Sequence, residues 1–271
     1  MDEAGIWFNA NSLASISLVK SPITPTTINL IYNISMSKFI IFAHPRSGST
    51  SLARVLGEIK GVKMCIEPFH PSFSIWYPME KNYHKLITDA KSMKDALNEI
   101  FEKYTGIKVL SYQFPEKIYF SMLSNKNYKI LFLTRKNLLD AALSNMIAEQ
   151  TKEWHRSDNL SVYDQLKPIP ITKIEEWIKC VDGTNNTHSK FLEENRPNEY
   201  FSLYYEDLFF EDIKTNANTL QRICSYLNLP LPPTESIEKY MIPANSKINR
   251  NELYKKLPNY EEIVKHFSGL G

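Results

Sequence analysis

The 271-residue sequence has three cysteines, a net charge of only +2, and no apolar run of membrane-spanning length. Cys65, Cys180 and Cys224 stand alone, without the paired spacing of a disulfide framework or a metal site, and the histidines are scattered. We therefore expect reduced cysteines, a cytoplasmic protein and no bound metal. The small net charge provides no basic field of the kind that favours nucleic acid as a partner.

Residues 1–37 differ from the rest of the chain, because they have weak periodicity and many Ser, Thr, Asn and Pro residues. The start is acidic, and polar residues interrupt each apolar run, which disfavours a signal peptide or a transmembrane helix. We predict a poorly ordered extension over residues 1–37 and one domain over residues 38–271. Met36 would make a natural start, and a truncation at Met36 that fails to fold would contradict this hypothesis.

From Lys38 onward, short apolar runs alternate with longer amphipathic stretches, as in a parallel sheet covered by helices. The helix after the fourth run is expected to begin after Asn137 as N-cap, and the helix over 172–195 to have a possible break at Asp182-Gly183. Repeated strand and helix units imply right-handed crossovers, so the predicted fold is an α/β three-layer sandwich with a central parallel sheet. The expected strands are KFIIFA (38–43), VKMCI (62–66), GIKVL (106–110), YKILFLT (128–134) and EYFSLYY (199–205).

The first predicted strand runs into the sequence His-Pro-Arg-Ser-Gly-Ser-Thr-Ser. Gly48 permits a turn, and a helix that begins near Thr50 would direct its positive end toward an anion. A helix cap needs one hydroxyl, and this loop has several donors, so we favour an anion site. An ATP-binding loop would need a second glycine followed by lysine, and both are missing here. The side-chain donors are Arg46, Ser47, Ser49, Thr50 and Ser51.

At this loop the sequence resembles the sulfotransferases that use 3′-phosphoadenosine 5′-phosphosulfate (PAPS). PRSGSTS, residues 45–51, is similar to their 5′-phosphosulfate loop. In that family a later strand ends in an arginine, and a serine eight or nine residues further on helps it to bind the 3′-phosphate. Arg135 and Ser144 fit the longer spacing, and Lys136 fits the shorter one. We prefer Arg135, because a guanidinium can bind two phosphate oxygens at once.

Two further segments, RKNLLDAALSNMIAEQTKEWH (135–155) and YYEDL (204–208), resemble the bacterial carbohydrate sulfotransferases of the nodulation-factor and trehalose group. The resemblance implies a P-loop-like sulfotransferase fold and transfer of a sulfuryl group from PAPS to a hydroxyl of a small molecule or glycan, such as a sugar or glycolipid. The second product would be 3′,5′-adenosine bisphosphate. No metal is implied.

The resemblance also implies a glutamate as general base, and Glu67 follows the second predicted strand. His70 is the rival, since an imidazole needs less perturbation to act near neutral pH. Alternatively, Glu67 is a loop carboxylate paired with a nearby Lys or Arg. Arg46 would neutralise charge on the phosphosulfate. The predicted catalytic residues are Glu67, Arg46 and His70, and the predicted nucleotide-binding residues are Arg46, Ser47, Gly48, Ser49, Thr50, Ser51, Arg135 and Ser144.

For several other residues the sequence allows both a role in the site and a structural or surface position. His44 either orients the loop or lies at the surface, and Trp154 with His155 either lines the acceptor side or packs. Aromatic residues Phe69, Phe73, Trp76 and Tyr77 form either a sugar-stacking wall or core, and Lys247 and Arg250 contact phosphate or solvent. The alternative functions are a nucleotide kinase, which would bind ATP and magnesium, and a nucleotide-binding protein without catalysis.

Overall fold

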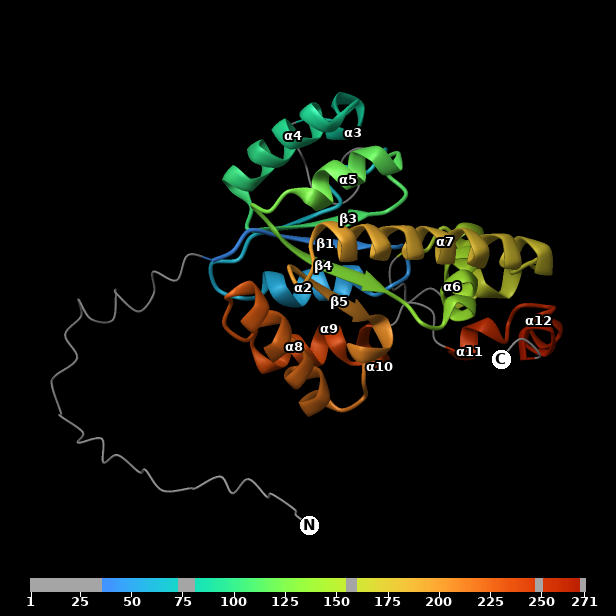
Figure 1. The fold of residues 1–271 in the computed structure, drawn as a ribbon. Coiled ribbons are helices and arrows are strands. Elements are labelled where there is room, and N and C mark those ends of the chain that lie inside the picture. Colours follow the sequence, from blue (N-terminus) through green and yellow to red (C-terminus); the bar gives the residue numbers. More distant parts are fainter. Residues whose placement is uncertain (1–35, 73–80, 155–159, 247–250, 269–271) are drawn as a thin grey trace, which may run out of the picture. The chain divides into compact units, whose positions relative to one another are not determined.

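Five parallel strands form the central sheet of the protein, as seen in a computed structural model (Figure 1). The structure describes residues 36–72, 81–154, 160–246 and 251–268. The predicted extension over 1–37 lies outside these residues except for its last two. The strands are β1 (Phe39–Ala43), β2 (Met64–Ile66), β3 (Gly106–Leu110), β4 (Lys129–Thr134) and β5 (Tyr200–Tyr204).

The strand order is β2-β3-β1-β4-β5, and each neighbouring pair is parallel. All five strands coincide with runs expected from the sequence. β1 lies in the centre, with Phe39 in register with Gly106 on one side and Lys129 on the other. The five residues of β1 are fully buried, which explains why its sequence is a continuous apolar run rather than an alternating one.

Helices cover both faces of the sheet, so the α/β three-layer sandwich is confirmed (Figure 1). Helices α3, α4 and α5 lie on one side of the sheet, and α2, α8 and α9 lie on the other. No helix within the described ranges is both long and apolar enough to cross a membrane. The helices are α2 (Ser49–Gly57), α3 (Tyr83–Leu86), α4 (Ala90–Lys103), α5 (Glu116–Ser124), α6 (Leu138–Thr151), α7 (Ile171–Asn195), α8 (Ile213–Leu227), α9 (Thr234–Met241), α10 (Pro243–Ser246), α11 (Asn251–Tyr254) and α12 (Tyr260–Ser268), with 3₁₀ turns η1 (Leu160–Gln165) and η2 (Tyr205–Asp207).

The core has one apolar layer on each face of the sheet, because alternate residues of a strand point to opposite faces. Phe39 and Ile41 pack with the side chains of α2 and α8. Ile40 and Phe42 pack with those of α4 and α5. A third apolar cluster joins α6 and the first half of α7 to η1, α11 and α12.

Helix α7 is continuous over 25 residues, so the possible break at Asp182-Gly183 was wrong. A glycine inside a helix costs only about 1 kcal/mol relative to alanine. Val181 and Leu192 are buried on either side of Gly183 and hold the helix to the rest of the fold. Asn137 does cap α6 as expected, since its side chain accepts a hydrogen bond from the Asp140 backbone N–H.

The chain leaves the neighbouring strands β1 and β4 toward opposite faces of the sheet. β1 leads to α2 on the face of Phe39. β4 leads to α6, which packs on α7, and Leu192 of α7 packs with Ile40 and Phe42 on the other face. In open α/β sheets such a divergence leaves a crevice outside the carboxyl ends of the strands, where ligands bind. The loop after β1 and the residues after β4 therefore meet at this crevice.

Candidate functional site

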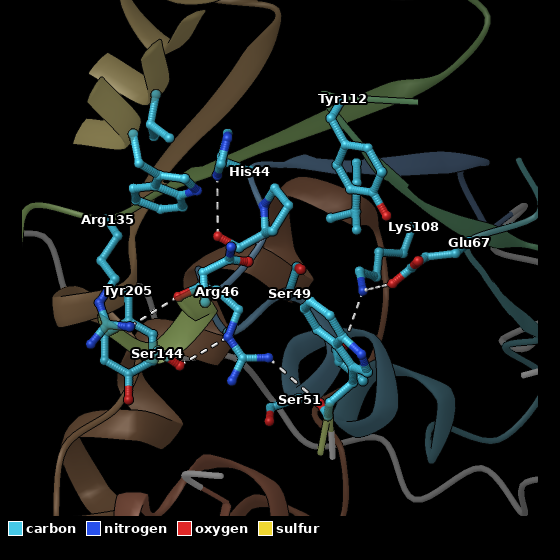
Figure 2. A pocket seen from close by; sticks show the side chains of 18 of the residues that line it. His44, Arg46, Ser49, Ser51, Glu67, Lys108, Tyr112, Arg135, Ser144 and Tyr205 are labelled. Atoms are coloured by element: carbon cyan, nitrogen blue, oxygen red, sulfur yellow. Dashed lines mark hydrogen bonds and ion pairs between the residues drawn. The ribbon is translucent and has the colours of Figure 1, made fainter. Parts of the chain in front are cut away.

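A pocket of about 540 Å³ lies at the carboxyl ends of the strands (Figure 2). Its size is in the usual range for small-molecule sites, about 300–1,000 Å³. Segments that follow all five strands of the sheet contribute to it, so residues far apart in the sequence meet here. The predicted site residues that line it are Arg46, Gly48, Ser49, Thr50, Ser51, Glu67, His70, Arg135 and Ser144.

The loop after β1 turns tightly through left-handed backbone at Arg46 (φ 66°) and Gly48 (φ 79°). A Cβ atom at Gly48 would lie 2.4 Å from the Phe209 ring, so the loop needs glycine for both conformation and space. Ser47 does not line the pocket. It is buried, and its hydroxyl donates to the carbonyl of His44 (2.7 Å), which stabilises the turn.

Helix α2 begins at Ser49 with Gly48 as its N-cap, and no side-chain hydrogen bond caps it among the described residues. The hydroxyls of Ser49, Thr50 and Ser51 are therefore not used for capping. They stand at the positive end of the helix, inside the pocket. This arrangement is that of an anion-binding turn.

Arg46 connects this loop to helix α6. Its Nε donates to the Ser144 hydroxyl (2.9 Å), and Nη1 reaches the carbonyl of Trp154 (3.5 Å). Burial lowers the pKa of Arg46 to about 10, so the guanidinium is still protonated at neutral pH. The pocket thus contains a permanent positive charge beside the hydroxyl-rich turn.

Arg135, at the end of β4, is buried and lies beside Arg46. Its Nη1 donates to the backbone carbonyl of Arg46 (3.0 Å), its Nη2 pairs with Asp140, and its guanidinium lies 4.2 Å above the ring of Tyr205. Lys136 faces away, is half exposed and pairs with Asp207 (3.0 Å). Of the two basic residues that the sequence allowed, only Arg135 lines the pocket.

Glu67 also has left-handed backbone (φ 56°), which is uncommon for a residue other than glycine and is often found at functional sites. Its Oε1 accepts from Nζ of Lys108 (2.5 Å), and its Oε2 lies 4.0 Å from Nε2 of His70. The alternative to a base role was that Glu67 is paired with a nearby Lys or Arg, and Lys108 is that partner.

Lys108 is the main functional candidate that sequence reasoning missed. It lies in β3, with its side chain 3% exposed, and its Nζ also donates to the Thr50 hydroxyl (2.8 Å). Burial lowers its pKa, while the charge of Glu67 opposes this shift. A single lysine inside an otherwise apolar strand, GIKVL, was the available signal.

The open side of the pocket is aromatic. Tyr112 and Trp154 are exposed, and Trp177 of α7 meets the His44 ring edge to face at 5.3 Å. His44 therefore packs in the pocket wall, and burial lowers its pKa to about 4, so it is neutral near pH 7. Asn145 and Glu149 of α6 add an amide and a carboxylate joined by a 2.7 Å hydrogen bond.

Phe69 does not belong to this wall, contrary to one reading of the sequence. It is fully buried and packs edge to face against Tyr83 and Phe114. The other aromatic candidates of that segment, Phe73, Trp76 and Tyr77, lie outside the described residues, as do His155, Lys247 and Arg250. Among the described residues, no group of three or more His, Cys, Asp and Glu side chains is placed to hold a metal ion.

The fold and the pocket define an α/β protein with a pocket lined by basic and hydroxyl side chains at the carboxyl edge of its sheet. Two sulfotransferases are among the solved structures of similar fold. The mouse sulfotransferase SULT7A1 complexed with PAP has a TM-score of 0.46 and 14% identity, with 86% of this chain and 82% of that chain covered. The sulfotransferase domain from the curacin biosynthetic pathway has a TM-score of 0.42 and 14% identity, with 86% and 98% covered.

No protein-family model matches the sequence. No curated protein matches it either.

Proposed function

We propose that this protein is a sulfotransferase that moves a sulfuryl group from PAPS to an acceptor hydroxyl. The observation that carries the proposal is the 2.9 Å hydrogen bond from Arg46 to Ser144. It brings the loop assigned to the 5′-phosphosulfate against the helix assigned to the 3′-phosphate. PAPS carries anionic groups at both positions, so it needs two cationic subsites close together, and Arg46 and Arg135 would serve them.

Glu67 is the proposed base. His70 Nδ1 accepts a hydrogen bond from the Ser72 N–H (3.1 Å), so a neutral His70 carries its proton on Nε2, which faces Glu67. In that tautomer His70 has no lone pair directed at the pocket, and we assign it to orienting Glu67. The acceptor oxygen attacks sulfur, its proton passes to Glu67, and the bond from sulfur to the bridging phosphate oxygen breaks.

Lys108 and Arg46 supply positive charge to this step. Negative charge accumulates on the phosphate oxygen that leaves, and donors placed in advance lower the barrier. The Lys108 ammonium lies between the proposed base and Thr50 of the loop. We therefore assign it to the sulfuryl oxygens, and Arg46 to the phosphate side of the breaking bond.

The proposed acceptor is a hydroxyl of a carbohydrate or glycolipid. A sugar has apolar ring faces and polar edges, and the open side of the pocket offers both kinds of partner. Trp154, Trp177 and Tyr112 present aromatic surface, while Asn145 and Glu149 present an amide and a carboxylate.

Incubation with radiolabelled PAPS and a panel of sugars, glycolipids and phenols tests this proposal. We expect label in a sugar-containing product, and loss of transfer in Arg46→Ala and Glu67→Gln with the fold retained. Arg135→Ala should mainly raise KM for PAPS, because Arg135 is assigned to a phosphate that does not react. Labelling of phenols alone would contradict the acceptor class. A nucleotide kinase would instead transfer phosphate from magnesium-ATP.

A further inference from the structure

Two of the three nitrogens of the Arg135 guanidinium, Nη1 and Nη2, have a partner among the residues that the structure describes, and the third, Nε, has no hydrogen-bond partner there. Nη1 donates to the backbone carbonyl of Arg46 (3.0 Å), and this contact fixes the guanidinium against the loop. Nη2 contacts Oδ2 of Asp140, a residue in the first turn of α6. Nε is buried and has no hydrogen-bond partner within the described ranges, and Oε1 of Glu206 lies 3.9 Å from it.

Nε and Nη2 form the edge with which an arginine binds a phosphate through two parallel hydrogen bonds. Asp140 blocks this edge, since it holds Nη2 with one carboxylate oxygen and leaves Nε unsatisfied. A buried N–H without a partner is unfavourable, because it has lost its hydrogen bond to water and gained none in the protein. The arrangement is therefore an incomplete ion pair, and a phosphate would complete it.

We propose that Asp140 competes with the 3′-phosphate of the nucleotide for Arg135. This inference rests on the proposed function and adds to it a residue that sets nucleotide affinity. In the free protein Asp140 holds the guanidinium. When nucleotide binds, the carboxylate is displaced from Nη2, and when the bisphosphate product leaves, Asp140 takes the guanidinium back. Asp140 thereby weakens product binding and speeds product release.

Two backbone contacts hold Asp140 in place independently of its carboxylate. Its N–H donates to Asn137 Oδ1 (2.9 Å), and its carbonyl accepts from the hydroxyl of Tyr254 (3.3 Å). Displacement of the carboxylate from Nη2 leaves both of these backbone contacts in place. Because removal of the carboxylate charge spares both backbone contacts, Asp140→Asn is expected to retain the helix start.

The test is calorimetric titration of wild type and Asp140→Asn with 3′,5′-adenosine bisphosphate and, separately, with adenosine 5′-monophosphate. We expect Asp140→Asn to bind the bisphosphate about tenfold more tightly, the lower end of the coupling measured between close charge pairs. Its affinity for the monophosphate should be unchanged. Stopped-flow displacement should show that the higher affinity of the variant comes from a slower dissociation of the bisphosphate.

Asp207→Asn is the matched control, because Asp207 is an acidic residue of the neighbouring turn that pairs with Lys136 at the exposed side. Asp207→Asn removes one negative charge but leaves the Arg135–Asp140 pair intact. We expect its affinity for the bisphosphate to differ from that of wild type by no more than about twofold, as for an exposed ion pair. Three outcomes would overturn the inference about Asp140 but not the proposed function. The two proteins could bind the bisphosphate equally, the variant could bind it more weakly, or the variant could gain affinity equally for both nucleotides. Absence of bisphosphate binding by wild type would overturn the proposed function as well.

Discussion

Nζ of Lys108 lies 2.5 Å from Oε1 of Glu67, and this ion pair joins the middle of β3 to the residue directly after β2. The lysine is almost wholly buried, and the glutamate side chain is 12% exposed. The charge of Glu67 compensates that of Lys108, whose ammonium is almost wholly removed from water. Nζ of Lys108 also donates to the Thr50 hydroxyl in the loop after β1 (2.8 Å), so the pair contributes both to stability and to the proposed chemistry.

Lys108→Met should reduce the rate of sulfuryl transfer by about 100-fold or more, the usual effect of removing one preorganised donor. The variant also leaves Glu67 without its partner and should lower the free energy of unfolding by about 3 kcal/mol. Lys63→Met, at an exposed lysine just before β2, is the control and should change neither the transfer rate nor the free energy of unfolding. Turnover assays and urea unfolding measure the two effects.

A double variant separates the two roles of the pair. Lys108→Met combined with Glu67→Gln removes both charges, so it should recover most of the lost stability and none of the lost transfer. Recovery of transfer, or full turnover in Lys108→Met alone, would show that the pair is only structural.

Gly48→Ala should abolish bisphosphate binding, because the new Cβ would collide with the rings of Phe209 and Tyr205 at a position with φ of +79°. The left-handed backbone alone is unfavourable by about 1–2 kcal/mol for alanine. Gly183→Ala is the matched control in α7, where nothing lies within 4 Å of the added Cβ. That change should raise the free energy of unfolding by about 0.5–1 kcal/mol. If Gly48→Ala binds like wild type, the loop is not the anion site.

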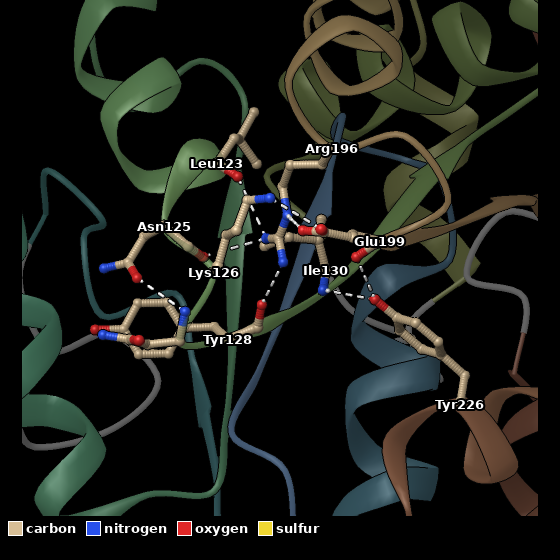
Figure 3. Close-up of polar contacts among 9 residues, drawn as sticks. Leu123, Asn125, Lys126, Tyr128, Ile130, Arg196, Glu199 and Tyr226 are labelled. Atoms are coloured by element: carbon tan, nitrogen blue, oxygen red, sulfur yellow. Dashed lines mark hydrogen bonds and ion pairs between the residues drawn. The ribbon is translucent and has the colours of Figure 1, made fainter.

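Arg196 is a structural anchor rather than a site residue (Figure 3). Its guanidinium donates to the backbone carbonyls of Leu123 and Asn125 (3.3 Å each) and Tyr128 (2.9 Å), and so joins the end of α7 to the start of β4. Arg196→Ala leaves these buried carbonyls unsatisfied and should lower the free energy of unfolding by about 2–4 kcal/mol.

Lys126→Ala provides a control within the same cluster, because Lys126 pairs with Glu199 at the surface. It should change stability by less than about 1 kcal/mol. Guanidinium unfolding curves compare the two variants. If both variants lost the same free energy of unfolding, the exposed ion pair, and not the buried guanidinium, would hold the end of α7 to the start of β4.

His188 should make the fold sensitive to acid. It lies against the rings of Phe42, Tyr119 and Phe120, and burial, with a smaller effect of His44, lowers its pKa from 6.5 to about 4. The unfolded chain therefore binds more protons between pH 6.5 and 4, so stability is full above pH 6.5 and falls as the pH is lowered. The loss from this one residue approaches about 3 kcal/mol by pH 4.

His188→Leu should flatten this pH dependence, and His44, whose pKa is lowered in the same way, should account for part of the slope that is left. The exposed His266 supplies the control variant His266→Gln. Thermal unfolding between pH 4 and 8 gives the comparison, and identical profiles for His188→Leu and wild type would refute the assignment.

The sheet could be predicted from the sequence because strands buried on both faces need continuous apolar runs, as in KFIIFA and YKILFLT. Helix α7 was harder to predict, since Gly183 and the polar residues around it look like a break unless the buried contacts of Val181 and Leu192 are known. The small helices α10 and α11 have too few residues to show a period and were not predicted.

The candidate site could be predicted where a motif is contiguous, as in residues 45–51, and not where the fold brings single residues together. The choice between Arg135 and Lys136 depends on which of two successive residues after β4 faces the crevice. Lys108 looks like any strand residue until β2 places Glu67 next to it. The ion pair between Asp140 and Arg135, on which the proposed competition rests, depends on side-chain geometry that no spacing encodes.

Calorimetric titration of the wild-type protein with 3′,5′-adenosine bisphosphate in the absence of magnesium tests the central claim most directly. We expect saturable binding without the metal, at least about tenfold tighter than that of adenosine 5′-monophosphate, because Arg135 would form a bidentate pair with the added phosphate. Magnesium-dependent binding of ATP together with no binding of the bisphosphate would contradict the claim.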